Sequence, residues 1–213
     1  QYGKPLTFDI PDAPRCRTAE FSPKTDLWKT WSCLRNPDDA RLSLTARPGW
    51  LRLRGSGHGL DAGKPAPELM GVPPWEQPGA VKGFSGTAFL GVRQGHFTVN
   101  TTVVADFHPA QPGEEAGLAV FMSERCHYRI TIRLENGRRA VRLVKSVLDM
   151  ESEGAPVLVG DGPLKLEIAA ASQLYSFFVS EAAGGRHTLG TGLPRLLSTE
   201  VAGGFTGVFL GLY

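Results

Sequence analysis

Carboxylates are the side chains best suited to chemistry in this sequence, and two short groups of them are candidates for it. Glu114 and Glu115 are adjacent, whereas Asp149, Glu151 and Glu153 recur at every second position. A glycosidase needs two carboxylates held on either side of the scissile bond. Adjacent residues of a strand point to opposite faces, so Glu114 and Glu115 do not form such a pair. The alternating group could line one strand face, but an exposed acidic edge is the favoured interpretation.

Sequence motifs of the common catalytic classes are all incomplete. The sequence lacks the Glu-x-Asp-x-x-Glu pattern of jelly-roll glucanases, the His-Glu-x-x-His zinc motif and the Gly-x-Ser-x-Gly elbow, from which the run Gly83-Phe-Ser-Gly86 departs. The five histidines are isolated from one another. We therefore predict that the chain is not an enzyme by itself. The alternative is a jelly-roll enzyme that acts on a glycan at an active site of its own.

Sugar binding makes weaker demands on a sequence than catalysis does. It needs an aromatic ring that stacks on the sugar and polar side chains that bind its hydroxyl groups. Trp50 and Trp75, the latter in the proline-rich run 73–78, are candidates for stacking, whereas core packing is favoured for Trp28 and Trp31. The predicted ligand-binding residues are Trp75, Arg93, His127, Tyr128 and Phe205.

Cofactor sites are not evident in the sequence. Cys16, Cys33 and Cys126 lack metal-ligand spacing, and a disulfide between the first two is an open alternative. We predict no cofactor. The alternative is a structural calcium ion bound by oxygen ligands such as Asp9 and Asp12.

Charge and hydropathy limit the classes of partner and the cellular locations that the sequence favours. The net charge of +2 comes from scattered groups of both signs, which argues against a nucleic-acid partner. No apolar run reaches 18 residues, so no membrane partner is expected. There is no signal peptide, although a mature secreted fragment would also lack one, and an extracellular location is favoured.

Short alternating runs separated by turns dominate the chain. Asn136-Gly137 is typical of a type I′ turn and predicts a hairpin of residues 127–135 and 139–147. Residues 164–168 and 175–179 predict a second antiparallel pair, and residues 203–213 a closing glycine-rich strand. Helical periodicity is limited to one turn around 193–197. The predicted fold is therefore an all-β antiparallel sandwich, or jelly roll.

Alternation also predicts which side chains are buried. Phe121 and Tyr128 are expected on the opposite face from their strand neighbours, exposed to a ligand or partner. The expected core residues are Leu118, Val120, Ile130, Ile132, Leu166, Ile168, Phe178 and Phe209.

Four ordered stretches resemble the C-terminal β-sandwich of family 43 glycoside hydrolases of the β-xylosidase type. They are residues 34–38 with 43–44 and 47–55, residues 88–94 with 96–97, residues 113–118 with 127–128, and residues 203–211. The resemblance implies a concanavalin-A-like β-sandwich over residues 19–213. Residues 1–18 match poorly and are expected to be a linker or an edge strand.

The resemblance also implies a function. In that family the domain follows a five-bladed β-propeller, which carries the three catalytic carboxylates, and it packs on that propeller and helps to close its pocket. Isolated relatives are classed as modules that bind xylan. We therefore expect a non-catalytic accessory module for xylan or xylo-oligosaccharides, associated with a hydrolase of the β-xylosidase or α-L-arabinofuranosidase type. A purely structural interdomain module is an alternative. By the same resemblance, Phe205 supplies a ring to the rim of the propeller's pocket.

Overall fold

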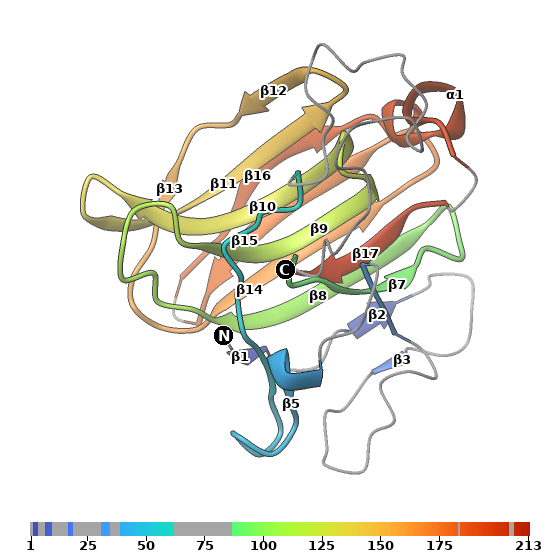
Figure 1. Ribbon diagram of the computed structural model, residues 1–213. Coiled ribbons are helices and arrows are strands. Elements are labelled where there is room, and N and C mark those ends of the chain that lie inside the picture. The colour runs from blue at the N-terminus through green and yellow to red at the C-terminus, as the bar shows by residue number, and fades with distance from the viewer. Residues whose placement is uncertain are drawn as a thin grey trace.

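Two antiparallel β-sheets lie face to face in the computed structural model of the chain (Figure 1). The structure describes residues 2–3, 7–9, 17–18, 31–34, 39–61, 87–182, 184–204 and 207–213. Within these ranges nearly every regular element is a strand. The predicted antiparallel sandwich is confirmed.

The first sheet has the strand order β16-β15-β14-β8-β1-β6-β5, with β2 paired to β3 and β8. The backbone of β1 pairs with β6 on one side and β8 on the other. Residues 2–3 thus belong to the sheet, whereas the division of the chain into residues 1–18 and 19–213 stays a prediction. The strands are β1 (Tyr2–Gly3), β2 (Thr7–Asp9), β3 (Arg17–Thr18), β5 (Leu42–Ser43), β6 (Leu51–Leu53), β8 (Val99–Asp106), β14 (Leu164–Ala170), β15 (Tyr175–Glu181) and β16 (Arg186–Gly192).

The second sheet has the strand order β12-β11-β10-β9-β17-β7-β4, and β13 pairs with β11. The predicted helical turn is a 3₁₀ turn, η5 (Pro194–Leu197), which is followed by α1 (Thr199–Ala202); another 3₁₀ turn spans Asp39–Arg41. The strands of this sheet are β4 (Ser32–Cys33), β7 (Leu90–Arg93), β9 (Glu115–Ser123), β10 (Cys126–Glu135), β11 (Arg138–Val147), β12 (Met150–Glu153), β13 (Val157–Leu158) and β17 (Phe209–Leu212).

The β10–β11 hairpin is the longest local pairing in the second sheet and confirms the predicted turn. Asn136 and Gly137 both have positive φ angles, 50° and 73°. Such angles define a type I′ turn, whose twist matches that of the flanking strands. The hairpin therefore holds Cys126 opposite Val147 at its open end.

The core lies between the two sheets, as alternation predicts. Ile130, Ile132 and Leu118 of the second sheet are fully buried, and so are Leu166 and Ile168 of the first. Each of these strands contributes every second side chain to this layer, because successive residues of a strand point to opposite faces. Val120 completes the set of confirmed core residues.

Two predicted core residues instead occupy outer faces. In β15 the inward side chains are Tyr175, Phe177 and Val179, so Phe178 points outward and is only half-buried under the guanidinium of Arg186. Phe209 is likewise half-buried, on the outer face of the second sheet. The prediction for both residues was wrong by one position in the alternation.

The burial of Tyr128 and Phe121 differs from expectation, and Phe97 does not follow the alternation of β8. Tyr128 has the same strand parity as Ile130 and therefore lies fully buried between the sheets, not on an exposed face. Phe121 does lie on the outer face, but it is buried there in a small cluster that includes Leu60. Phe97, which alternation places with the core residues of β8, is 81% exposed because it precedes the strand.

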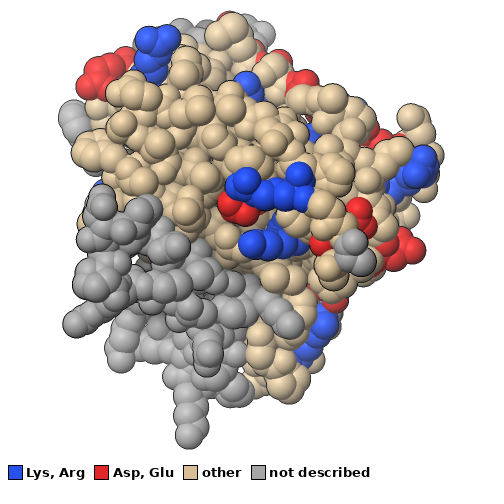
Figure 2. Space-filling view, turned by 180° about the vertical axis from the view of Figure 1, so that it is seen from behind, with Lys and Arg blue, Asp and Glu red and all other residues tan. Residues whose placement is uncertain are grey.

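The outer face of the first sheet carries little charge. Figure 2 shows this side of the molecule, where the charged side chains form small groups in which both signs adjoin. One such group joins Glu167 of β14 to Arg186 of β16 at 2.6 Å. No helix in the described ranges has the length and apolar character needed to cross a membrane.

Candidate functional site

A row of four side chains crosses the outer face of the second sheet. Arg93 of β7, Phe209 of β17, Phe121 of β9 and His127 of β10 are successive cross-strand partners. The Arg93 guanidinium lies 5.1 Å from the centre of the Phe209 ring, and the His127 ring stacks on Phe121 at 5.8 Å. Two predicted ligand residues, Arg93 and His127, thus share one face but are separated by two phenyl rings.

His127 is fully buried at one end of this row. Its Nε2 atom lies 3.0 Å from Nη1 of Arg129, and its Nδ1 atom lies 3.3 Å from the carbonyl oxygen of Ser123. A guanidinium group can only donate, so Nε2 accepts, and Nδ1 carries the proton that it donates to Ser123. In this arrangement neither ring face is open to a sugar.

Tyr128 points away from that row, into the core. Its hydroxyl group donates to the carbonyl oxygen of Leu193 at 3.1 Å, and its ring meets those of Tyr175 and Phe177 edge-on. Burial raises the pKa of Tyr128 to about 12. The expected exposed stacking surface is therefore absent at this residue.

Some of the remaining aromatic candidates are buried, and others lie outside the described residues. Trp75 and Phe205 lie outside the described residues, as does Trp28. Trp31 is buried, in agreement with its favoured core interpretation. Trp50 is also buried, under the guanidinium of Arg47 at 3.8 Å.

Alternating ion pairs cover the outer face of β9 to β12. Arg129 lies between two carboxylates, 3.5 Å from Glu115 and 3.3 Å from Glu151, and Ser146 donates to Glu151 at 2.7 Å. Burial raises the pKa of Glu115, and the charge of Arg129 opposes this. Glu115 is thus the described carboxyl whose environment most resembles that of a general acid.

A second set of ion pairs continues the same face. Arg133 donates to Glu153 at 2.8 Å, and Arg142 donates to Glu135 at 2.6 Å. Hydrogen bonds from Arg142 lower the pKa of Glu135, and those from Arg133 lower the pKa of Glu153. Glu151 and Glu153 of the predicted acidic edge are therefore bound to arginines, although both residues remain exposed at the surface.

We expect these ion pairs to make the free energy of unfolding depend on pH in the acid range. A carboxyl whose pKa is lowered on folding stabilises the folded state above its unfolded pKa, about 4.3 for glutamate, and loses that contribution as pH falls through the folded pKa. Glu153→Gln should therefore lower the melting temperature at neutral pH, and the gap to wild type should close below about pH 4.3.

The control for this prediction is Asp149→Asn, a change at an exposed carboxyl close to Glu153. Its melting temperature should follow that of wild type throughout. A Glu153→Gln gap that stays constant from neutral to acid pH would show that the ion pair with Arg133 contributes nothing.

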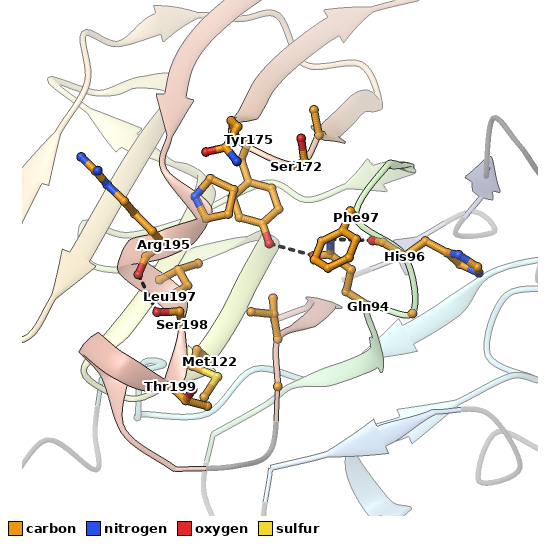
Figure 3. A pocket seen from close by; sticks show the side chains of 16 residues that line it. Gln94, His96, Phe97, Met122, Ser172, Tyr175, Arg195, Leu197, Ser198 and Thr199 are labelled. Atoms are coloured by element: carbon orange, nitrogen blue, oxygen red, sulfur yellow. Dashed lines mark hydrogen bonds between the residues drawn. The ribbon is translucent and has the colours of Figure 1, made fainter.

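A cavity of about 520 Å³ opens at one end of the sandwich (Figure 3). It lies between the loop after β7, the turn between β14 and β15, and η5. The Tyr175 hydroxyl group donates to Oε1 of Gln94 at 2.8 Å, and Nε2 of Gln94 donates to the carbonyl oxygen of His96 at 2.8 Å. These two bonds fix the loop that carries Phe97 beside the cavity.

Exposed apolar side chains gather around this end. Among the described residues, three of the five exposed large hydrophobic side chains belong to its loops: Phe97, Leu174 and Leu193. Apolar groups gathered at a surface mark interaction sites more often than isolated ones do. We call this end, defined by Phe97, Leu174, Leu193 and η5, the apolar end.

The glycine-rich segment after α1 also belongs to the apolar end, since Gly207 lines the cavity. Gly203, Gly204 and Gly207 have φ angles of 71°, 76° and 72°. Other residue types rarely adopt this left-handed region, which explains why glycine flanks the predicted docking residue Phe205. The cavity could not be predicted from the sequence, because its lining comes from loops that are distant in the chain.

Cation sites require a cluster of suitable ligands. No group of three or more His, Cys, Asp or Glu side chains placed to hold a metal ion occurs in the part of the chain that the structure describes. Cys16, Asp12 and the side chain of Asp9 lie outside that part, so the predicted disulfide and calcium alternatives stay predictions.

Comparison with protein families gives one match that spans nearly the whole sandwich. The family model of the β-xylosidase C-terminal concanavalin A-like domain matches residues 18–213. This model carries the same fold that the two packed sheets show.

Individual proteins agree with the family match. The chain is 32% identical over 195 residues to the non-reducing end α-L-arabinofuranosidase BoGH43B of Bacteroides ovatus, which covers 91% of the chain and 32% of that protein. It is 23% identical to a xylosidase/arabinosidase of Butyrivibrio fibrisolvens, over 80% of the chain and 29% of that protein.

Solved structures show the same arrangement. A structure of the Bacteroides ovatus xyloglucan PUL protein GH43B superposes with a TM-score of 0.75 at 31% identity, over 92% of the chain and 34% of its own length. A xylan β-1,4-xylosidase of Bacillus halodurans has the same fold, with a TM-score of 0.73 at 19% identity, over 96% and 37%. The chain therefore spans about a third of the length of the relatives that it matches.

Proposed function

The chain belongs to the family of C-terminal concanavalin A-like domains of glycoside hydrolase family 43 β-xylosidases, and from this premise we propose that it is a non-catalytic accessory module. The module packs against a β-propeller catalytic domain and binds xylan or xylo-oligosaccharides. The enzyme that it serves acts outside the cell on arabinose- or xylose-containing glycans.

The observation that carries the docking part of this proposal is the apolar end. Phe97 is 81% exposed, and Leu174 and Leu193, which adjoin other lining residues of the cavity in sequence, are also exposed. An apolar surface of this kind is stabilised when a partner covers it. Gly207 lines the cavity at the same end, and the family resemblance assigns to Phe205 a position at the rim of the propeller's pocket.

The surroundings of the carboxylates support a non-catalytic role. Glu115 and Glu151 both contact Arg129, which lies between them. Glu135 and Glu153 likewise form ion pairs with arginines. A catalytic acid and base must instead face a substrate and exchange protons with it.

Docking is tested by Phe97→Asp in the propeller-bearing protein that contains this domain. A buried charge at the centre of an interface costs at least about 2 kcal/mol, so turnover of an aryl-xyloside should fall by about tenfold or more. The matched control is Leu158→Asp, a charge at an exposed leucine of β13, away from the apolar end. Equal turnover in wild type and both variants would show that the docking surface does not include Phe97.

A further inference from the structure

A second cavity, of about 700 Å³, lies at the end of the sandwich opposite the apolar end. Glu115, at the first position of β9, lines this cavity, whereas Met122, near the last position, lines the other. Phe107 and Phe97 flank the two ends of β8 in the same way. Strands of this length keep the two cavities about 20–25 Å apart. We call the second cavity the polar end cavity.

Four charged side chains line the polar end cavity. Arg52 and Arg54 of the β6 segment face one side, and Glu114 and Glu115 of the β9 segment belong to the other. The lining thus carries both signs of charge, and its two carboxylates already have partners: Glu115 is paired with Arg129, and Glu114 accepts from the backbone amide of Ala110 at 2.7 Å. An anionic ligand would meet two carboxylates and a cationic ligand two guanidinium groups, so the lining suits a neutral ligand that offers both donors and acceptors.

The loop of residues 55–59 forms one wall and is held in place by its own hydrogen bonds. The Ser56 hydroxyl group donates to the carbonyl oxygen of His58 at 3.0 Å, and the Thr87 hydroxyl group donates to that of Gly59 at 3.1 Å. His58 and Thr87 also form a parallel β-bridge. A wall fixed in this way loses little conformational entropy when a ligand binds.

Apolar groups complete the lining. Phe107 and Leu60 border the cavity together with the polar side chains. A pocket with an apolar wall, a few fixed polar groups and a volume in the range of about 300–1,000 Å³ is typical of a small-molecule site. Sugars present both surfaces, because their C–H faces are apolar and their hydroxyl groups both donate and accept hydrogen bonds.

We propose that the polar end cavity binds an uncharged oligosaccharide chain, with Arg54 and His58 as hydrogen-bonding residues. This inference rests on the proposed accessory function, in which the apolar end faces the propeller. The opposite end then faces solvent and holds a polysaccharide away from the catalytic pocket. The module thereby separates its two tasks, docking at one end and glycan binding at the other.

The test is titration calorimetry with xylohexaose, cellohexaose and an oligogalacturonate of similar length. The wild-type domain should bind a neutral hexaose, and the charged oligogalacturonate should not bind. Loss of one hydrogen-bonding side chain should weaken binding by about tenfold in Arg54→Ala and in His58→Ala. The matched controls, Arg195→Ala and His96→Ala, remove the same residue types from the apolar end cavity and should bind as wild type does.

The outcomes separate this site from the general function. If wild type binds a hexaose and the Arg54 and His58 variants bind equally well, the module binds glycans at another site and the polar end cavity is excluded. If only the Arg195 or His96 variants lose affinity, the glycan site lies at the apolar end. If wild type binds no hexaose, the glycan-binding function fails together with this site. Unchanged melting temperatures establish that each variant is folded.

Discussion

Phe177→Ala is expected to lower the free energy of unfolding by about 3–5 kcal/mol, the usual cost of removing a buried phenyl ring. Phe177 is fully buried in the layer between the sheets. Its ring meets that of Tyr128 edge-on at 6.1 Å and lies 6.4 Å from that of Tyr175. Removal leaves a cavity that rigid strands on both sides cannot fill. Urea denaturation measures the difference.

Phe178→Ala is the matched control, because it removes the same side chain from the next position in β15. The Phe178 ring lies on the outer face under Arg186, with the guanidinium carbon 3.3 Å from the ring centre. A cation–π contact at the surface contributes about 0.5–1 kcal/mol, and the half-buried ring gives up less apolar burial than that of Phe177, so the effect should be clearly smaller. A larger effect at Phe178 than at Phe177 would mean that β15 is shifted by one residue and that its faces are exchanged.

Arg129→Ala has the second large expected effect, a loss of about 3–5 kcal/mol of stability, as measured when one partner of a buried ion pair is removed. The Arg129 side chain is buried and contacts Glu115, Glu151 and His127. Without it, the half-buried Glu115 carboxylate lacks its counter-charge. The His127 ring also loses the donor to its Nε2 atom.

The control for this effect is Arg138→Ala, an exposed arginine beside the β10–β11 turn, whose replacement should change stability little. Adding Glu115→Gln to Arg129→Ala should restore part of the loss, because the uncompensated charge is then gone. Equal stability of Arg129→Ala and wild type in urea denaturation would show that the ion pairs of Arg129 do not contribute to the stability of the fold.

Strand positions and the main hairpin were predictable because their causes are local. The Asn136-Gly137 turn sets the register of β10 and β11, and alternation then assigns Ile130 and Ile132 to the core. Alternation does not assign a face when two adjacent residues are both aromatic. Phe177 and Phe178 fit either face equally well, and the pairing with β16 is irregular at this pair.

The site was less predictable, because it depends on which distant segment covers a sheet face. His127 lies on the outer face of the sheet, yet Arg129 and Phe121 enclose it. Nothing in the local sequence indicates that Leu60 returns to pack on the same face. Both end cavities are likewise built from loops that are close in space but far apart in the chain.

Hydrolysis of an aryl-xyloside and of xylan by the purified domain tests the central claim, its non-catalytic role, most directly. The carboxylates on the outer face of β9 to β12 form ion pairs with arginines, so no turnover above the uncatalysed rate is expected. Glu115→Gln should make no difference to this result. Turnover that survives repeated purification and disappears in Glu115→Gln would contradict the account and make the domain an enzyme with an active site of its own.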